Sequence, residues 1–195
     1  MFYINEIEDK VRVTPEFFKE KPKEAITRIL REEYERRVYR DLGVIIVVFD
    51  TVVEGDGLVI PGDASAYYDV KFKALTFMPY VNEVYETEIK DVVDFGAFCL
   101  LGPLQGLTHI SQIGQDKFLF NKKLKKLSSK NGKRSIKKGD KGLVKISTVS
   151  LKSNISETKI GLTMRSPGLG KLEWIEEENE KKPKKAKEKP KGEKK

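Results

Sequence analysis

Five short apolar segments follow one another between residues 80 and 165, separated by glycine, proline, aspartate and asparagine. Short apolar segments between turn residues are typical of strands rather than helices. Five such strands, with a longer connection between the third and the fourth, predict an all-β five-stranded barrel of the OB-fold type. The predicted strands are Val84–Val93, Ala97–Leu101, Leu107–Ser111, Gly142–Val149 and Lys159–Met164.

The first 80 residues have a different pattern, which begins with a strand and a helix. Apolar and charged residues mix over residues 2–13, which favours a strand. Pro22 stands where a helix would begin, because proline is well accommodated at the first helical position. From there apolar residues recur every three or four positions as far as Tyr34, which predicts a helix.

Further strands follow in the same part of the chain. The continuous apolar run Val44–Phe49 predicts a strand that is buried on both faces. Residues 68–73 alternate between apolar and charged, as in a half-exposed strand, and turn signals stand at Glu54–Gly57 and Pro61–Asp63. We therefore expect an α+β domain (strand, helix, antiparallel strands) over residues 1–80 and the barrel over residues 81–175.

The C-terminal segment consists almost entirely of Glu, Lys, Pro, Ala and Gly, and no large apolar residue follows Ile175. Such a segment cannot bury enough apolar surface to offset its conformational entropy. We therefore predict a disordered tail over residues 176–195. Trp174 stands directly before it, where it either closes the barrel or anchors a partner.

The chain has a formal net charge of +8, which favours a polyanionic partner. The charge is concentrated in the long connection of the predicted barrel, and between Lys117 and Lys145 only Asp140 opposes it. This cationic stretch contains Lys122, Lys123, Lys125, Lys126, Lys130, Lys133, Arg134, Lys137, Lys138 and Lys141. It predicts an electrostatic track for nucleic acid, and the alternative is a solvated loop.

Phe95 and Phe98 flank a Gly-Ala pair in the predicted barrel. Strand side chains alternate between faces, but a bend at Gly96 would let both rings point the same way. An exposed aromatic ring stacks on an unpaired base, which is worth roughly 1–3 kcal/mol per base. Single-stranded RNA is therefore the expected ligand, and the alternative is that the rings fill the barrel core.

Other classes of protein are disfavoured by what the chain contains. Cys99 is the one cysteine, so a disulfide framework is excluded and core packing is expected. No apolar run approaches the roughly 20 residues that span a bilayer, and no N-terminal signal is visible. We expect a soluble, cytoplasmic protein that does not bind membranes. His109 is the one histidine and has no companion His or Cys at metal-ligand spacing, so a metal site is not expected. No paired carboxylates, Ser-His-Asp arrangement or phosphate-binding Gly-rich loop is visible, so neither a cofactor nor enzymatic catalysis is expected.

Four motifs of the predicted barrel together resemble the RNA-binding barrel of the ribosomal-protein-S-one type: Asp94–Phe98, Gly106–Ser111, Lys138–Asp140 and Ile160–Thr163. Three further segments resemble signatures of the larger stalk subunit of archaeal RNA polymerase, which is called E-prime: Asp41–Gly43, Val59–Asp63 and Ser166–Trp174. The eukaryotic counterpart of that family is the seventh-largest polymerase subunit. The resemblance extends over essentially the whole of the chain before the predicted tail.

The resemblance implies a non-catalytic subunit of DNA-directed RNA polymerase that assists transcription initiation and elongation. It implies a heterodimer with the smaller, helical stalk protein of the polymerase, called F, which would cover apolar residues near Phe77, Met78, Pro79, Leu172 and Trp174. The N-terminal tip domain would dock on the large core subunits through turn residues, of which Lys21, Pro22, Gly55, Gly57, Pro61 and Gly62 are the candidates. Turn chemistry alone is the alternative explanation of those glycines.

The barrel would contact emerging single-stranded RNA. The candidate residues are Phe95, Phe98, His109, Lys122, Lys123 and Lys159. His109 would touch a base or the RNA backbone, and the alternative is a structural role. Two departures from the barrel pattern, Thr87 for a glycine and Ser150 for an acidic residue, predict weak, sequence-tolerant binding through phosphate contacts and stacking.

Three alternatives to the stalk subunit share the barrel. An exosome cap subunit usually adds a second RNA module or a zinc ribbon, and neither is visible after Met164. Translation initiation factor alpha subunits carry the barrel at their N-terminus rather than in the second half of the chain. A pure assembly subunit would keep the barrel without affinity for RNA.

Overall fold

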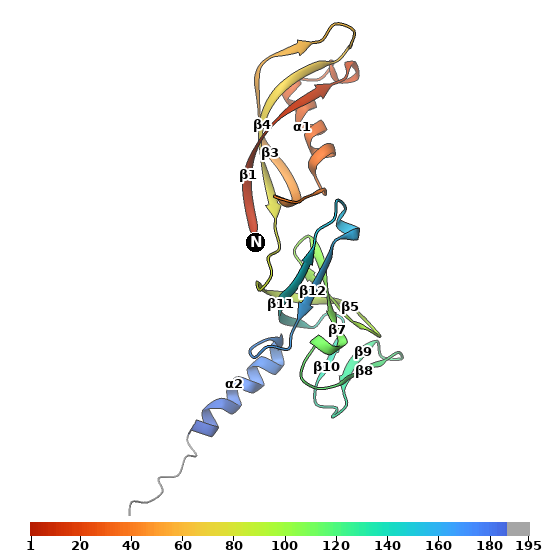
Figure 1. Cartoon of the computed structure of the whole chain (residues 1–195), viewed down its shortest axis with the longest axis vertical. Coiled ribbons are helices and arrows are strands. Elements are labelled where there is room, and N and C mark those ends of the chain that lie inside the picture. Colours follow the sequence, from red (N-terminus) through yellow and green to blue (C-terminus); the bar gives the residue numbers. More distant parts are fainter. Residues whose placement is uncertain (187–195) are drawn as a thin grey trace, which may run out of the picture. The chain divides into compact units, whose positions relative to one another are not determined.

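The structure is a computed structural model that describes residues 1–186 and divides the chain into two compact units (Figure 1). Unit 1 contains Met1–Tyr80 and also Ser150–Lys159, and unit 2 contains Val81–Val149 and the chain from Ile160 onward. None of the helices within residues 1–186 has the length and apolar character needed to cross a membrane.

Unit 1 is an antiparallel sheet of four strands with a helix on one face (Figure 1). The sheet order is β1-β4-β3-β2, and the strands are β1 (Phe2–Val13), β2 (Val38–Tyr39), β3 (Gly43–Val59) and β4 (Ala66–Phe77). A short 3-10 helix, η1 (Pro15–Phe17), leads to helix α1 (Pro22–Tyr34), which starts at Pro22 as predicted.

The apolar side of α1 is buried against the sheet and forms the core of unit 1. Ile26 and Leu30 of α1 are fully buried, one helical turn apart as the helical period requires. The core cluster consists of Val11, Val13, Ile26, Leu30, Ile45, Val48, Val70, Phe72 and Ala74. The predicted order of strand, helix and antiparallel strands is therefore confirmed.

Unit 2 contains the closed five-stranded barrel that the sequence predicts. Its strands are β5 (Val84–Val93), β6 (Gly96–Leu101), β7 (Leu104–His109), β11 (Lys141–Ser150) and β12 (Lys159–Thr163). They pair in the order β12-β7-β6-β5-β11, and a further pairing of β12 with β11 closes the barrel. The short strand β13 (Gly170–Lys171) pairs with β11, and the 3-10 helices η2 (Ile110–Gln112) and η3 (Ile155–Glu157) follow β7 and β11.

The long connection between β7 and β11 is folded rather than an open loop. It contains a second antiparallel sheet, formed by β8 (Phe118–Asn121), β9 (Lys126–Ser129) and β10 (Ser135–Lys137). Leu127 and Ile136 are fully buried in it. The sequence did not predict these strands, because each is very short and lysines dominate the pattern around it.

The predicted turn at Glu54–Gly57 is wrong, because β3 continues through it. Glu54 pairs with Asp69 and Leu58 pairs with Tyr67, so extra residues of β3 bulge out opposite Tyr68. Gly55 has a φ of +68°, and a Cβ on Gly57 would lie 2.5 Å from the Tyr68 ring. These glycines therefore permit a bulge rather than a chain reversal.

Helix α2 (Leu172–Ala186) extends into the first part of the predicted tail, over residues 176–186. Glu, Lys and Ala are good helix formers, so a segment too polar to form a core still extends an anchored helix. Residues 187–195 of the predicted tail lie outside the described residues. The anchor is Trp174, which is 7% exposed and stacks on Phe118 with ring centroids 6.1 Å apart.

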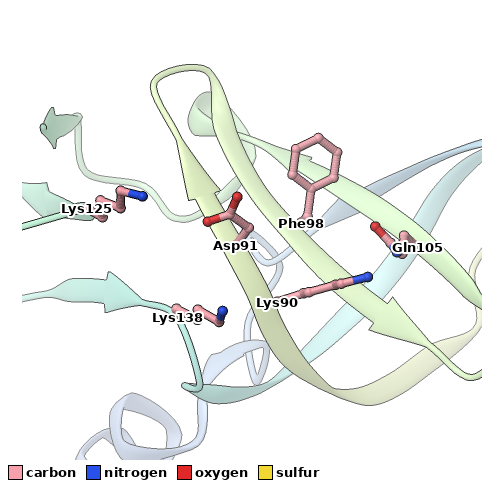
Figure 2. A pocket seen from close by; sticks show the side chains of 6 residues that line it. All are labelled: Lys90, Asp91, Phe98, Gln105, Lys125 and Lys138. Atoms are coloured by element: carbon pink, nitrogen blue, oxygen red, sulfur yellow. The ribbon is translucent and has the colours of Figure 1, made fainter.

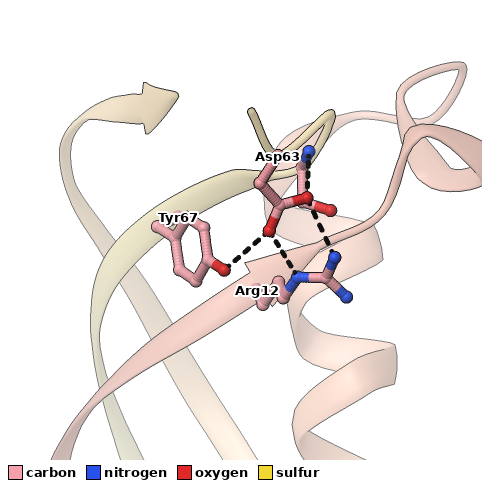
Figure 3. Close-up of polar contacts among 4 residues, drawn as sticks. Arg12, Asp63 and Tyr67 are labelled. Carbon is pink, nitrogen blue, oxygen red and sulfur yellow. Dashed lines mark hydrogen bonds and ion pairs between the residues drawn. The ribbon is translucent and has the colours of Figure 1, made fainter. Parts of the chain in front are cut away.

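A polar cluster holds the turn between β3 and β4 (Figure 3). The Arg12 guanidinium donates through Nε and Nη2 to the two carboxylate oxygens of Asp63, over 3.1 and 2.9 Å. The Tyr67 hydroxyl and the Ser65 backbone N–H also donate to this carboxylate. These donors favour the charged form, so Arg12 first and Tyr67 second hold the pKa of the Asp63 carboxyl well below its usual range.

This cluster predicts a pH dependence of stability. A carboxyl whose pKa is lowered by folding stabilises the native state above its unfolded pKa, near 4, and the contribution is lost as the pH falls through the lower folded value. We expect Asp63→Asn to lower the melting temperature by a few degrees at pH 7, and the difference from wild type to shrink below pH 4. Asp56→Asn, an exposed aspartate of the same unit, is the control in thermal melts. A difference that is constant with pH would contradict this account.

Candidate nucleic-acid interface

The register of β5, β6 and β7 places an aromatic and a polar group on one side of the barrel wall. Asp91 pairs with Phe98, Phe98 pairs with Leu107, and Gly96 pairs with His109. Directly opposed residues of antiparallel strands share a face of the sheet. Phe98 and His109 therefore belong to the same face.

That face is the outer one, because the alternating residues fill the barrel. Ala97 and Cys99 of β6 are fully buried, whereas Phe98 between them is only partly buried. The Cys99 Sγ lies 3.6 Å from the Thr108 Oγ1, and burial raises the pKa of the thiol to about 11. Cys99 is a core residue as predicted, and the alternative that Phe98 fills the core is wrong.

Phe95 lies beside Phe98 but in the turn of the β5–β6 hairpin rather than on a strand. It is 48% exposed, and the two ring centroids are 6.2 Å apart with an interplanar angle of 86°. The bend expected at Gly96 is not found, since Gly96 pairs regularly with Val93 and His109. A Cβ there would lie 2.3 Å from the Thr108 carbonyl oxygen, so glycine allows a close approach of β6 to β7.

His109 is exposed, and its side chain caps the N-terminus of η2. Its Nδ1 accepts a hydrogen bond from the Ser111 backbone N–H over 3.3 Å, which caps η2, and lies 2.9 Å from the Ser111 Oγ. With Nδ1 as an acceptor, the proton of the neutral ring is on Nε2. The structural and the ligand-binding interpretations of His109 are therefore compatible.

A hollow of about 520 Å3 opens around Phe98, and we call it the Phe98 hollow (Figure 2). Figure 2 shows the Phe98 ring standing out from the ribbon of the hairpin, with Lys125 and Lys138 approaching from other segments. The hollow is lined by Lys90, Asp91, Phe98, Gln105, Lys125 and Lys138. Three ammonium groups thus face one carboxylate around an aromatic ring.

A β-bulge places Lys90 in this hollow. Ile89 pairs with Cys99 and Asp91 pairs with Phe98, so Lys90 is an extra residue of β5 without a partner in β6. At the same point the Gly139 N–H donates to the Ile89 carbonyl over 2.8 Å, and the Ile89 N–H donates to the Asp140 carbonyl over 2.9 Å. Bulges redirect side chains, and here the bulge and the Gly139 turn bring Lys90 and Lys138 to the same hollow.

A buried ion pair holds the Gly139 turn from the other side. The Lys171 Nζ lies 3.2 Å from the Asp140 Oδ1, and the two side chains are 11% and 7% exposed. The second Asp140 oxygen accepts the Lys137 backbone N–H over 2.9 Å. Burial alone would lower the pKa of Lys171, but hydrogen bonds to Glu173 and Asp140 outweigh it, so the pKa is raised and the ammonium stays charged.

The other candidate RNA-binding residues, Lys122, Lys123 and Lys159, do not line the Phe98 hollow. Lys122 lines a second, adjoining hollow, and Lys123 is exposed in the β8–β9 turn, where its backbone N–H donates to Asn121. Lys159 is the exposed first residue of β12, which pairs with β7, and it is not among the residues that line either hollow.

Two of the six core-docking candidates share a hollow in unit 1. Pro22 and Gly57 line it together with Phe17, Phe18, Val59 and other residues of β1 and β4. Lys21 is the N-cap residue of α1, Pro61 and Gly62 form the turn before Asp63, and Gly55 lies in the β3 bulge.

The expected contact surface for the smaller stalk protein needs a correction. Phe77 is fully buried, with its ring centroid 4.9 Å from that of Phe2, and Trp174 is nearly buried because it stacks on Phe118. Neither side chain is accessible to a partner. Unit 1 exposes other apolar residues, among them Phe2 and Ile4 at the start of β1, which are 56% and 66% exposed.

Sequence reasoning did not select several residues of the Phe98 hollow as site residues. Lys90 and Gln105 gave no signal, because a bulge and a cross-strand register are not visible in one sequence. Lys125 and Lys138 were in the cationic stretch, and the Lys138–Asp140 motif was the one indication that this part of it returns to the barrel. Within residues 1–186, no cluster of His, Cys, Asp and Glu side chains is placed to hold a metal ion.

Comparisons with known proteins define the class of this chain. A family profile described as "SHS2 domain found in N terminus of Rpb7p/Rpc25p/MJ0397" matches residues 8–64, and one described as "S1 RNA binding domain" matches residues 79–158. The chain is thus an SHS2 domain followed by an S1 barrel.

Similarity along the whole chain identifies the family. DNA-directed RNA polymerase subunit Rpo7 of Sulfolobus acidocaldarius is 36% identical over 178 residues, which cover 91% of this chain and 97% of that protein. Rpo7 of Saccharolobus shibatae is 36% identical over 85% of this chain and 92% of its own length. The polymerase III subunit RPC8 of Saccharomyces cerevisiae is 32% identical over 43% of this chain and 40% of its own length. The chain belongs to the Rpo7 family of RNA polymerase subunits, which confirms the resemblance inferred from the sequence.

The Asp140–Lys171 pair predicts a defined effect on stability. Lys171→Met leaves a buried carboxylate without its counter-ion, and we expect a loss of about 3 kcal/mol in the free energy of unfolding of unit 2. Adding Asp140→Asn to Lys171→Met removes the unpaired charge and should recover part of that loss. Denaturant unfolding of the three proteins measures both steps. A double variant no more stable than Lys171→Met would contradict the role assigned to the pair.

Proposed function

We propose that this chain acts as a stalk subunit of an archaeal, cytoplasmic RNA polymerase and binds nascent single-stranded RNA in the Phe98 hollow. The observation that carries the proposal is the outward Phe98 ring within a hollow lined by three lysines and one aspartate. Its membership of the Rpo7 family and its match to an S1 RNA-binding domain support the same conclusion.

The chemistry of the Phe98 hollow suits a flexible single strand. A base stacks on Phe98 with Phe95 at its edge, while Lys90, Lys125 and Lys138 neutralise neighbouring phosphates. Every base has a π-face and every nucleotide has a phosphate, so binding of this kind tolerates any sequence. The expectation of weak, sequence-tolerant binding therefore stays part of the proposal.

We also propose that the unit 1 hollow docks on the large polymerase subunits and that the smaller stalk protein binds elsewhere on the chain to form the heterodimer. Phe18 and Val59 line this hollow together with Pro22 and Gly57, and they are 53% and 62% exposed. Exposed apolar side chains that gather on one surface are typical of interaction sites. The exposed start of β1 is a second apolar surface, which suits the smaller stalk protein.

Two phenylalanines separate the two binding functions. We expect Phe98→Ala to weaken binding of single-stranded RNA roughly tenfold, as the loss of one stacked base predicts, and to leave capture of the core polymerase unchanged. We expect Phe18→Ala, at a 53% exposed position, to weaken capture of the core and to leave RNA affinity unchanged.

Fluorescence anisotropy with labelled RNA and pull-down of polymerase lacking this subunit are the two measurements. Unchanged RNA affinity in Phe98→Ala would remove the RNA-binding proposal and favour a pure assembly subunit. Unchanged core capture in Phe18→Ala would remove the docking proposal alone.

Salt dependence tests the role of the lysines. For single strands, the slope of the logarithm of the binding constant against the logarithm of salt concentration is about −0.7 per phosphate contact. We expect Lys138→Ala to make the slope shallower by about 0.7, because it removes one such contact. Lys23→Ala, an exposed lysine of α1, is the matched control. Identical slopes for both variants and wild type would show that Lys138 does not contact the RNA.

A further inference from the structure

A second hollow adjoins the Phe98 hollow, and neither the domain match nor the sequence motifs assign it a role. It has a volume of about 380 Å3, and we call it the Phe120 hollow. One side is the end of β5 and the hairpin turn, and the other is the β8–β9 hairpin. The lining residues are Asp91, Val92, Val93, Asp94, Phe120, Lys122 and Lys125.

The two hollows adjoin, because Asp91 and Lys125 line both. Lys125 stands in the β8–β9 turn with a φ of 42°, a left-handed conformation that is uncommon outside glycine, asparagine and aspartate. The Asn121 Oδ1 accepts the backbone N–H groups of Lys123 and Leu124, which holds this turn in place. The boundary between the hollows is therefore a lysine on an ordered turn.

Phe120 packs beside a buried residue of β9 and lines the hollow with the rest of its ring. It pairs across the strands with Leu127, which is fully buried, while Phe120 itself is only half-buried. Phe118, two residues earlier on the same face of β8, is buried against Trp174. Leu119 between them points to the other face and is 58% exposed. The β8–β9 hairpin thus places the Phe120 ring in the hollow beside the buried Leu127.

The charges of the two hollows differ. In the Phe98 hollow Lys90, Lys125 and Lys138 outnumber Asp91, which suits phosphate. In the Phe120 hollow, two lysines face Asp91 and Asp94. A site with balanced charge suits an uncharged base better than a phosphate, since carboxylate oxygens repel phosphate but accept hydrogen bonds from base amino groups.

We propose that the Phe120 hollow is a second base-stacking subsite for the same single-stranded RNA. The strand passes from Phe98 over Lys125, which holds a phosphate between the subsites, to Phe120. OB folds bind about 4–16 nucleotides of single strand, so a path beyond one base is within their ordinary range. This inference rests on the proposed RNA-binding function and extends it to the β8–β9 hairpin.

Affinity for a labelled single-stranded RNA of about 12 nucleotides, measured at several salt concentrations, tests the proposal. We expect Phe120→Ala to weaken binding roughly tenfold, the loss of one stacked base, with an unchanged salt slope because no phosphate contact is removed. Phe120→Tyr keeps the aromatic face and should bind like wild type. Leu119→Ala, on the opposite face of the same strand, is the matched control and should also bind like wild type.

The half-buried position of Phe120 calls for a variant that preserves packing. Phe120→Leu keeps an apolar contact with Leu127 but has no ring, so it should fold normally and bind about as weakly as Phe120→Ala. Wild-type affinity in Phe120→Leu, with weakened binding in Phe98→Ala, would overturn the second subsite and leave the proposed function standing. Wild-type affinity in both variants would overturn the proposed function itself.

Discussion

The arrangement of the outer barrel face depends on the buried ion pair between Asp140 and Lys171. Asp140 is joined to three parts of the chain: its carboxylate binds Lys171 and the Lys137 backbone, and its carbonyl accepts the Ile89 N–H. Lys171 lies in β13, directly before α2. A short C-terminal segment therefore holds the turn that carries Lys138 against the bulge that carries Lys90. Because a buried charge is costly when unpaired, this connection either forms completely or destabilises the barrel.

Successive residues of each barrel strand alternate between the core and the outer face. Inward residues such as Cys99 and Thr108 are fully buried in the core, and outward residues such as Phe98 remain partly exposed. The inserted sheet of β8, β9 and β10 adds further lining residues to the hollows on the outer face. It contributes Lys125 to the Phe98 hollow and Phe120 to the adjoining one, so both hollows are lined by elements far apart in the sequence.

Much of this fold follows from local sequence patterns. The strands of the barrel and the start of α1 were predictable because apolar periodicity and Pro22 are strong local signals. The continuation of β3 past Gly55 and Gly57 was not, because the same glycines permit a turn or a bulge, and only pairing with β4 decides between them. Helix α2 was missed for a related reason: composition excludes a core but does not exclude a helix anchored by Trp174.

The candidate site was predictable in its aromatic part and not in its surroundings. Phe95, Phe98 and His109 carry the motif that suggested RNA, and the structure places all three at one edge of the barrel. Lys90 depends on a bulge and Gln105 on cross-strand register, and both are properties of paired strands rather than of one segment. For Trp174 the sequence left two interpretations open, packing within this chain or anchoring a partner. Its burial against Phe118 favours packing within this chain.

Photocrosslinking shows whether RNA lies on the outer face of the barrel. A single-stranded RNA that contains 4-thiouridine would be irradiated with the full-length protein, and the crosslinked peptides would be mapped by mass spectrometry. If RNA binds there, it crosslinks to residues within the segment from Lys90 to His109 and to residues of the β8–β9 hairpin. Crosslinks confined to residues 1–80 would contradict RNA binding on this face.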